Sequence, residues 1–556
     1  MVDPRTRALD QQFDIQHEVL RAPTKYFPLL LRAYRLKILM VTDGGGSFGR
    51  ADFGLSALLE TLSVPPGPWV AFDVTKAHRR FDPDADLNGF RFDVTDLSRF
   101  DQIWMFAVER AGSTVTVSDS ELAALSRFMD AGGGVFATGD HEDLGVAMCG
   151  RIPRVRSMRM WHWPSPGPNG EPVAPKVDGV NRFDTLSAGG DAGVQFDDQS
   201  DDVPQIIIPR MYSLTSWGPY FSRSRPHPLL CGPRGVIRQM PDHPHEGQCY
   251  EPTDLSASFT FGGVTVVEYP AGIGPEVVAT SRVSGGRLST DVKGLLNPRT
   301  FGSIGAYDGH RAGVGRVVVD STWHHFFDIN LIGALGTGDP VKSIGFDYSV
   351  SGHQAFEDIK SYFRNIAVWI ASDSAQREMW QRALWWLRWH HRIAMDLRPP
   401  FLERKVPFDL AELIRVGSEA RDALGQRASQ CTVLRWIYEF VVRPRVRRPW
   451  EELVPVLDPW GPRPPEPDPR VPQISEPMSD AVTMLHAEML ADAALGAAVY
   501  AVAMEFPVLD DEARDRAEKT DLAKIPAELV SDAFAELAAH AESNGAALAM
   551  FGDLLR

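Results

Sequence analysis

Three short stretches of the sequence combine histidine with acidic residues. They are Asp140-His141-Glu142-Asp143, His243 and His245 with Glu246, and His324-His325 with Asp328. Carboxylates and imidazoles carry out general acid–base catalysis and bind metals, and both are costly to remove from water. We therefore take these residues as candidates for a functional site.

The first stretch directly follows an apolar run at 135–138 that is typical of a buried strand. Ligands of open α/β sheets bind beyond the carboxyl ends of the strands. We expect Asp140 or Glu142 to act as a base, and His141 to act in catalysis or to bind a metal. The alternative is a solvated loop in which Asp140 or Asp143 caps the next helix.

The second stretch lies in a turn bounded by proline and glycine. Two histidines separated by one residue can present both imidazoles to one metal, and a nearby carboxylate can bind the metal or orient the rings. His243, His245 and Glu246 are therefore predicted ligands of a divalent metal, zinc or a similar ion. The alternative is a pair of surface histidines.

The third stretch follows another apolar run, at 317–319. We expect His324 or His325 to be the acid or base partner of the first stretch. Because the carboxyl ends of parallel strands lie at one rim of a sheet, the three stretches are expected to converge there. This convergence is the main argument for a functional site.

A glycine-rich turn follows the predicted strand at 36–42 and precedes a helical pattern. Its residues are Gly44, Gly45, Gly46 and Ser47. Such a turn lets backbone N–H groups approach an anion at the positive end of a helix, which makes these four residues candidates for cofactor binding. The spacing matches no phosphate-binding motif closely. The alternative is a tight turn that requires a positive φ.

The elements that must position these residues are predicted to alternate. Strands are expected at 36–42, 69–75, 102–108, 135–138 and 317–319, and a helix with Ser118 or Asp119 as its N-cap is expected from 118 to 131. Strands that alternate with helices indicate an α/β fold, with a parallel sheet and helices on both faces.

A chain of 556 residues is longer than one hydrophobic core usually serves, so several domains are expected. The predicted parts are an N-terminal extension (1–35), an α/β domain with insertions (36–355), a helical region (356–442), a Pro-rich linker (443–478) and a C-terminal helical domain (479–556). We expect the C-terminal helices to contact a protein partner or a second copy of the chain.

Composition narrows the possible partners. A net charge of -16 would repel nucleic acid and anionic membranes, so we expect neither as a partner and favour a small-molecule ligand. The N-terminus has no secretory signal, and the longest apolar run is too short to span a membrane, which predicts a cytoplasmic protein. Four scattered cysteines predict no disulfide framework.

Residues 36–350 resemble the class I glutamine amidotransferase-like fold, and within it the ThuA-like (trehalose-utilisation) branch. The resemblance is carried by the strand and glycine-rich turn that begin at Leu36, by the Gly-Gly-Gly-Val-Phe-Ala-Thr-Gly run at 132–139, and by the run at 315–325. It implies a flavodoxin-like parallel sheet with helices on both faces.

Amidotransferases of this fold place a nucleophilic cysteine on the turn after the central strand, and a histidine with an acid partner after the last strand. Here Gly139-Asp140-His141 occupies the first position, and His324 or His325 with Asp328 matches the second. Cys149 lies too far downstream to sit on the turn. Glutamine hydrolysis through a thiolate is therefore not expected.

Two functions follow from these observations. The first is a hydrolase or lyase that acts on a small polar molecule by acid–base or metal-assisted chemistry, with a carbohydrate derivative implied by the ThuA-like resemblance. The alternative is a sensing or scaffold module that has lost catalysis and assembles through the helical regions at 356–442 and 479–556.

Overall fold

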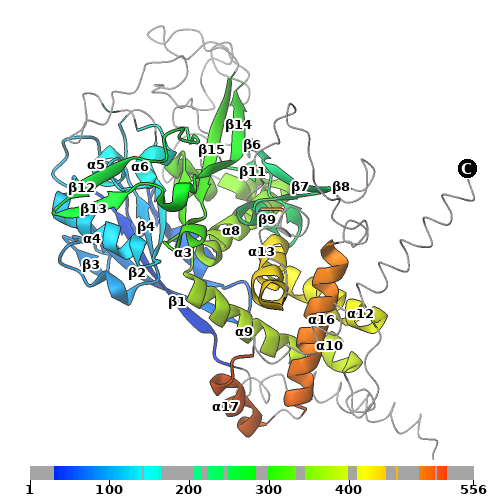
Figure 1. The fold of residues 1–556 in the computed structure, drawn as a ribbon. Helices are drawn as coiled ribbons and strands as arrows, with labels where there is room; N and C mark the ends of the chain where they lie inside the picture. The colour runs from blue at the N-terminus through cyan, green and yellow to red at the C-terminus, as the bar shows by residue number, and fades with distance from the viewer. Residues whose placement is uncertain are drawn as a thin grey trace, which may run out of the picture.

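The computed structural model describes residues 31–140, 143–161, 163, 205–215, 222–241, 248–283, 299–333, 345–397, 410–445, 459–460, 487–507 and 510–522. These residues form a mixed α/β structure around a ten-stranded sheet, with further helices packed beside it (Figure 1).

The first part of the sheet is parallel. Its strands lie in the order β3 (Leu87–Asn88), β2 (Val70–His78), β1 (Tyr34–Thr42), β4 (Gln102–Phe106), β5 (Gly134–Thr138) and β16 (Val317–Asp320). Every residue of β4, β5 and β16 is buried. Continuous apolar strands of this kind belong to a sheet that is covered on both faces, as the sequence predicted.

The chain reverses direction across this sheet between β1 and β4. It passes from β1 to β2 on one side, and then to β4 on the other side of β1. The carboxyl ends of β1 and β4 therefore flank a topological switch point, which is where open α/β sheets bind ligands.

The insertion between β5 and β16 extends the same sheet in antiparallel fashion, which the sequence pattern did not indicate. The added strands are β15 (Arg299–Tyr307), β14 (Glu276–Val283), β6 (Gln205–Pro209) and β11 (Gln239–Met240). Among the described residues, three antiparallel strand pairs lie outside the sheet: β7 (Met211–Thr215) with β8 (Ser222–Pro226), β9 (Cys231–Gly232) with β10 (Gly235–Val236), and β12 (Ser258–Phe261) with β13 (Val264–Val267).

The longer α-helices are α3 (Ser56–Ser63), α4 (Asp119–Asp130), α8 (Val350–Trp369), α9 (Asp373–Trp389), α10 (His391–Asp396), α12 (Leu410–Gly425), α13 (Gln430–Trp436), α16 (Ala487–Glu505) and α17 (Asp511–Lys519). A π-helical segment, η8 (Ile437–Val442), continues α13. No helix in the described part of the chain is long and apolar enough to cross a membrane.

The remaining helices of the described residues are short. The α-helical ones are α5 (Val146–Cys149), α6 (Val155–Met158) and α7 (Asp328–Leu331). The 3-10 helices are η2 (Leu97–Arg99), η3 (Pro228–Leu230), η4 (Pro270–Gly272), η5 (Gly309–Ala312), η6 (Trp323–His325), η7 (Gly345–Tyr348) and η9 (Arg443–Arg445).

Alternate side chains of β1 enter two different cores. Ile38 and Met40 pack in a cluster that includes α3 and α8, whereas Leu39 and Val41 pack in a cluster that includes α4. Successive side chains of a strand point to opposite faces of the sheet. Helices therefore cover both faces of the parallel strands.

The first cluster continues from the sheet into the C-terminal helices. It includes residues of α8, α9, α12, α13 and α16, and these helices lie together beside the sheet in Figure 1. The helix that follows the predicted linker, α16, thus packs in the same core as the helical region before it.

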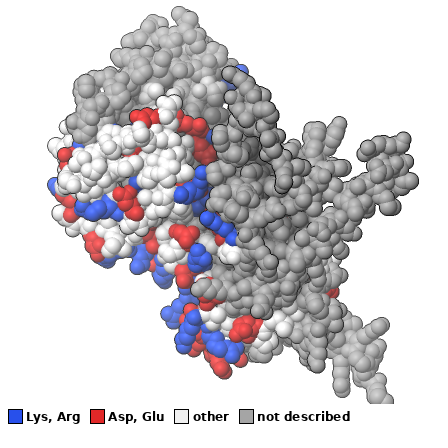
Figure 2. Space-filling model, in the orientation of Figure 1, with Lys and Arg blue, Asp and Glu red and all other residues white. Residues whose placement is uncertain are grey.

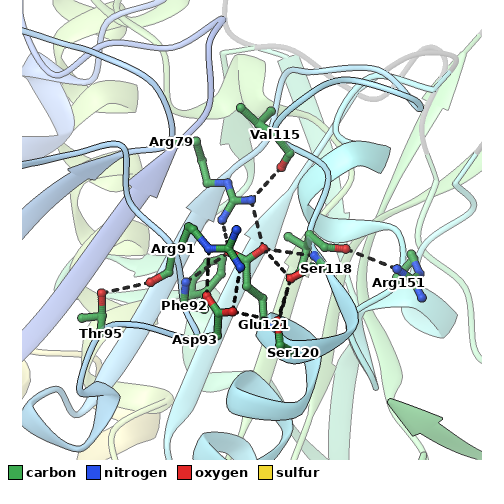
Figure 3. A network of polar contacts seen from close by, with 11 residues as sticks. Arg79, Arg91, Phe92, Asp93, Thr95, Val115, Ser118, Ser120, Glu121 and Arg151 are labelled. Carbon is green, nitrogen blue, oxygen red and sulfur yellow. Dashed lines mark hydrogen bonds and ion pairs between the residues drawn. The ribbon is translucent and has the colours of Figure 1, made fainter. Parts of the chain in front are cut away.

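A buried ion pair ties the end of β2 to the start of α4 (Figure 3). Ser118 caps α4 in a capping box with Glu121, which confirms the predicted N-cap. Glu121 also pairs with Arg79, and Arg79 Nη2 donates to the carbonyl of Val115 at 2.8 Å. The network holds the parallel strands in a fixed relation to α4.

Acidic and basic side chains are interspersed on the face of the molecule that Figure 2 shows, and its described residues form no continuous basic surface there. Exposed ion pairs of the described residues include Arg35 with Asp73 and Arg91 with Asp93, each at 2.7 Å. Such pairs are screened by solvent and contribute little to stability.

Candidate active site

The structure brings the first and third of the predicted stretches together. Asp140 lies just beyond β5, and His324 lies in η6 just beyond β16. The two strands are parallel neighbours, with Thr138 opposite Asp320. Their carboxyl ends therefore place Asp140 and His324 at one edge of the sheet.

Asp140 and His324 face each other in an almost enclosed position. His324 Nε2 is 3.6 Å from Asp140 Oδ2, and the two side chains are 8% and 4% exposed. This separation is an ion-pair distance and is longer than a hydrogen bond. Asp140 Oδ1 also accepts a hydrogen bond of 2.7 Å from Thr322 Oγ1.

The hydrogen bond at Nδ1 of His324 determines the tautomer of the ring. Nδ1 lies 2.8 Å from Asn330 Oδ1. With the amide oxygen assigned to this position, Nδ1 must be the donor, and Nε2 is the nitrogen that faces Asp140.

A buried arginine clamps the two loops that carry the pair. Arg159 Nη2 donates to the carbonyl oxygens of Asp140 at 2.5 Å and Ser321 at 2.8 Å. Its guanidinium lies over the Trp161 ring, 4.5 Å from the centroid. Burial lowers the pKa of Arg159, and the nearby Cys249 and Asp140 oppose that shift. Arg159 therefore joins the ends of β5 and β16.

His325 belongs to a separate network in the core. Its Nδ1 is 2.9 Å from Asp320 Oδ1, and Tyr362 donates its hydroxyl to Asp320 Oδ2 at 2.9 Å. All three side chains are buried. Burial and the Asp320 charge raise the pKa of Tyr362 well above its ordinary value. This network links β16 to α8, and Asp140 pairs with the other histidine.

Asp328 caps a helix. Its Oδ1 accepts from the N–H of Ala57 at 2.9 Å, and its Oδ2 accepts from Ser56 Oγ at 2.6 Å. These are the first residues of α3, whose N–H groups have no partner within the helix. The carboxylate that faces His324 is that of Asp140, whereas Asp328 serves α3.

The remaining histidines and acids of the prediction lie outside the described residues. They are His141, Glu142, His243, His245 and Glu246. Within the part of the chain that the structure describes, no group of three His, Cys, Asp or Glu side chains could hold a metal ion. The metal site stays a prediction for the second stretch.

The glycine-rich turn is held by its own hydrogen bonds. The N–H of Gly45 points to Asp43 Oδ1 at 3.5 Å, that of Gly46 to the Asp43 carbonyl at 3.2 Å, and that of Ser47 to the Phe53 carbonyl at 3.0 Å. These amides, predicted to meet an anion, are thus used within the protein. The N-terminus of α3 lies further along and is capped by Asp328.

Close packing explains the glycines of this turn. Gly44, Gly45 and Gly46 do not have a positive φ. A Cβ at Gly45 would lie 2.5 Å from a methyl carbon of Val108, and one at Gly46 would lie 2.1 Å from Thr42 Oγ1. Side chains at Gly45 and Gly46 would therefore require Val108 and Thr42 to move.

Asp43 stands at the switch point itself. Its Oδ2 accepts from the N–H groups of Val108 and Glu109, each at 2.9 Å, so it bridges the ends of β1 and β4. Burial raises the pKa of Asp43 to about 6, although the hydrogen bonds from these two amides oppose the shift. A carboxyl group that titrates near neutral pH is suited to acid–base work.

A solvent-exposed ion pair lies near Asp43 at the carboxyl edge of the sheet. Arg80 Nη2 lies 3.2 Å from Glu109 Oε1, and Ser113 donates to Glu109 Oε2 at 3.0 Å. A Cβ at Gly44 would lie 2.3 Å from the same Glu109 oxygen. The edge therefore carries charged groups from the end of β2 to the end of β16.

Several residues of this edge were absent from the predicted site. They are Asp43, Arg80, Glu109, Arg159, Thr322 and Asn330. Asp43, Glu109 and Thr322 lie within three residues of a strand end, so the same rule that singled out Asp140 could have found them. Asn330 left no such signal.

Comparison with known proteins assigns no family to this chain. No protein-family model matches the sequence, and no curated protein matches it. Among solved structures, the chain is similar to the mmIFT52 N-terminal domain, with 12% sequence identity and a TM-score of 0.23, over 52% of this chain and 88% of that chain. A likeness at this score supports no conclusion about fold or function.

Proposed function

We propose that the protein is a hydrolase or lyase that acts on a small polar molecule through Asp140 and His324. One observation carries the proposal: the two side chains come from adjacent parallel strands and face each other at the carboxyl edge, 3.6 Å apart. A carbohydrate-derived substrate follows from the resemblance to ThuA-like proteins.

The order of the parallel strands is that of a doubly-wound α/β sheet. Strands β2, β1, β4, β5 and β16 lie side by side in that order. With the two-residue β3 beside β2, the six parallel strands have the 3-2-1-4-5-6 order of one doubly-wound sheet, and without β3 they have the 2-1-3-4-5 order of a flavodoxin-like sheet. Both kinds of sheet bind ligands at the switch point beside the first strand. Asp43 lies at that point, next to the edge that carries Asp140 and His324.

The pair is suited to moving a proton. Nε2 of His324 and Oδ2 of Asp140 are too far apart for a direct hydrogen bond, so a water or a substrate hydroxyl can bond to both. His324 would accept the proton, Asp140 would stabilise the imidazolium, and Asn330 would keep the ring oriented. Hydrolysis and elimination both need a group that takes a proton and later returns one.

The nearest cysteine in the sequence does not offer a nucleophile. Cys149 ends α5 and is completely buried, and burial raises the pKa of its thiol well above the ordinary value. A buried thiol of high pKa is inert. This supports acid–base chemistry over the thiolate chemistry of glutamine amidotransferases.

Near-isosteric variants test the proposal. Turnover of a panel of glycosides, esters, amides and hydroxy acids would be measured for the wild type, Asp140→Asn and His324→Gln, with the exposed His391→Gln as a control. We expect both site variants to lose activity by about 100-fold or more, because acid–base groups contribute on that scale. Thermal melting would verify folding. Unchanged activity in both would refute the proposal.

A metal-assisted form of this chemistry would use His243, His245 and Glu246. Elemental mass spectrometry of the wild type and of a His243→Ala/His245→Ala variant tests it. A stoichiometric metal that the variant lacks is the expected result, and equal metal content in both would contradict it.

The second candidate function is a sensing or scaffold module without catalysis. The observation that favours it is the near-complete burial of the pair, because side chains only 8% and 4% exposed offer little access to a substrate. The same panel separates the two functions. If no member of the panel is turned over while the melting temperatures of the site variants fall, the pair is structural.

A further inference from the structure

One buried hydroxyl contacts both members of the pair at the carboxyl edge. Thr322 lies between the end of β16 and the start of η6. Its Oγ1 donates to Asp140 Oδ1 at 2.7 Å and accepts from the backbone N–H of His324 at 3.1 Å. A backbone N–H can only donate, and a hydroxyl has one proton of its own. That proton is therefore directed to the Asp140 carboxylate.

Other contacts hold the backbone of the two loops. The carbonyl of Asp140 accepts from Arg159 Nη2 at 2.5 Å. The N–H of Trp323, in η6, donates to the carbonyl of Gly139 at 3.0 Å. None of these contacts uses the Thr322 hydroxyl, so the loops should stay together when that hydroxyl is removed.

The orientation of the Asp140 carboxylate is a separate matter. The χ2 torsion of an aspartate is broad, so a fixed backbone does not decide which oxygen faces His324. The bond from Thr322 engages Oδ1, and Oδ2 lies 3.6 Å from His324 Nε2. On the other side of the pair, Asn330 contacts Nδ1 of the imidazole at 2.8 Å. Thr322 and Asn330 therefore each orient one member of the pair.

We propose that Thr322 is a positioning residue for the reaction at Asp140 and His324. Its hydroxyl keeps Oδ2 of Asp140 directed to Nε2 of His324, so that a water or a substrate hydroxyl between them can bond to both. A carboxylate that is already oriented need not turn when the imidazolium forms, which lowers the barrier. This inference rests on the proposed function.

Thr322 is also the N-cap of η6, so its loss should lower stability in any case. The test must therefore observe the pair itself. Nitrogen NMR of the full-length protein does so without a substrate. Histidines would be labelled with ¹⁵N, and the Nε2 resonance of His324 would be assigned by its loss in His324→Gln.

Three variants are compared in this experiment. Thr322→Val keeps the shape of the side chain without the hydroxyl, and we expect it to shift the Nε2 resonance of His324. Thr322→Ser retains the hydroxyl and should keep the wild-type resonance. Ser303→Ala is the matched control, because the Ser303 hydroxyl is also buried but has no hydrogen-bond partner among the described residues. Melting curves would verify folding, with Thr322→Ala as the replacement if Thr322→Val does not fold.

Kinetics on the substrate that the panel identifies provide the second readout. Thr322→Val should lower kcat by about 30-fold, because hydrogen bonds to charged groups contribute on that scale. KM should not change, since the buried hydroxyl acts on Asp140. Thr322→Ser should recover most of kcat, and Ser303→Ala should match the wild type.

The outcomes separate this inference from the proposed function. An unshifted Nε2 resonance in folded Thr322→Val would overturn the inference, as would a wild-type kcat in that variant while Asp140→Asn is inactive. In both cases the proposed function would stand. Retained activity in Asp140→Asn and His324→Gln would instead refute the proposed function, and the inference with it.

Discussion

At the scale of single residues, the candidate site depends on Arg159 as much as on the pair that it supports. Its guanidinium is buried and donates to carbonyl oxygens of Asp140, Met160 and Ser321. A planar fork can bond several acceptors at once, whereas an ammonium acts as a single charged point. The position of Asp140 relative to His324 therefore depends on this side chain.

We predict that Arg159→Lys destabilises the protein by about 3 kcal/mol, because a buried charge then loses part of its hydrogen bonding. Activity should fall as well, since Asp140 is no longer fixed. Urea unfolding measures the first effect. Arg35→Lys, at an exposed pair with Asp73, is the matched control and should change stability little. Equal stability of the two variants would contradict the role of Arg159.

The raised pKa of Asp43 predicts that the stability of the protein depends on pH. Its pKa rises from 3.8 in the unfolded chain to about 6 in the folded protein, so the folded state retains the proton longer. The contribution of this residue to stability therefore falls as the pH rises from 4 to 6, by ~3 kcal/mol at most. An asparagine at position 43 cannot ionise, so the Asp43→Asn variant would not lose stability in this way as the pH rises.

The measurement is urea unfolding of the wild type and Asp43→Asn at pH 4, 5, 6 and 7. We expect the stability of the variant, relative to the wild type, to improve as the pH rises through this window. Comparison at each pH removes the contribution of other titrating groups. A difference that stays constant across the four pH values would show that Asp43 ionises normally.

At the scale of elements, two helices approach so closely that only glycine fits between them. A Cβ at Gly417 of α12 would lie 1.7 Å from the carbonyl oxygen of Asp492, and one at Gly496 of α16 would lie 2.0 Å from that of Leu413. Both contacts are with backbone atoms, which cannot turn aside as side chains can. The glycines therefore set the distance between the helices.

Gly417→Ala should force the helices apart and destabilise the protein by about 2 kcal/mol, as overpacking in cores does. Gly425→Ala is the control on the same helix, because its Cβ would meet only the side chain of Gln430, which can move. Better helix propensity should leave that variant unchanged or slightly more stable. Equal melting temperatures for the two variants would contradict the close contact.

The sequence predicts the site residues that lie near a strand end, and it misses those that reach the site from other parts of the chain. Asp140 and His324 were found because each follows a buried strand, and the parallel register then brings them together. Asn330 acts through a contact that no local pattern encodes. Asp328 shows the same limit, because its carboxylate is close to His324 in the sequence but caps α3.

At the scale of the whole molecule, the sheet and the C-terminal helices share one apolar core. Composition predicted a linker at 443–478 and a separate domain after it. Proline content predicts an extended segment, but it carries no information about where the next helix packs. In the structure α16 lies against α12, and Arg421 of α12 pairs with Asp492 of α16 at 2.6 Å.

Truncation after Arg443 should therefore damage the protein. Removal of α16 would uncover apolar side chains of α12, including Leu413 and Val416, which are now buried. We expect aggregation or a markedly lower melting temperature, measured by size-exclusion chromatography and calorimetry. A truncated protein that melts as the full chain does, and elutes as a single species, would show that the helices after the linker form an independent domain.

The central claim is that Asp140 and His324 act as one acid–base unit. The most direct test is a double-mutant cycle in kcat/KM for the substrate that the panel identifies, with Asp140→Asn, His324→Gln and the double variant. If the two residues act as one unit, the double variant should be about as slow as the slower single variant. Losses that multiply would mean that the two residues act independently, and no loss in any variant would remove both from the reaction.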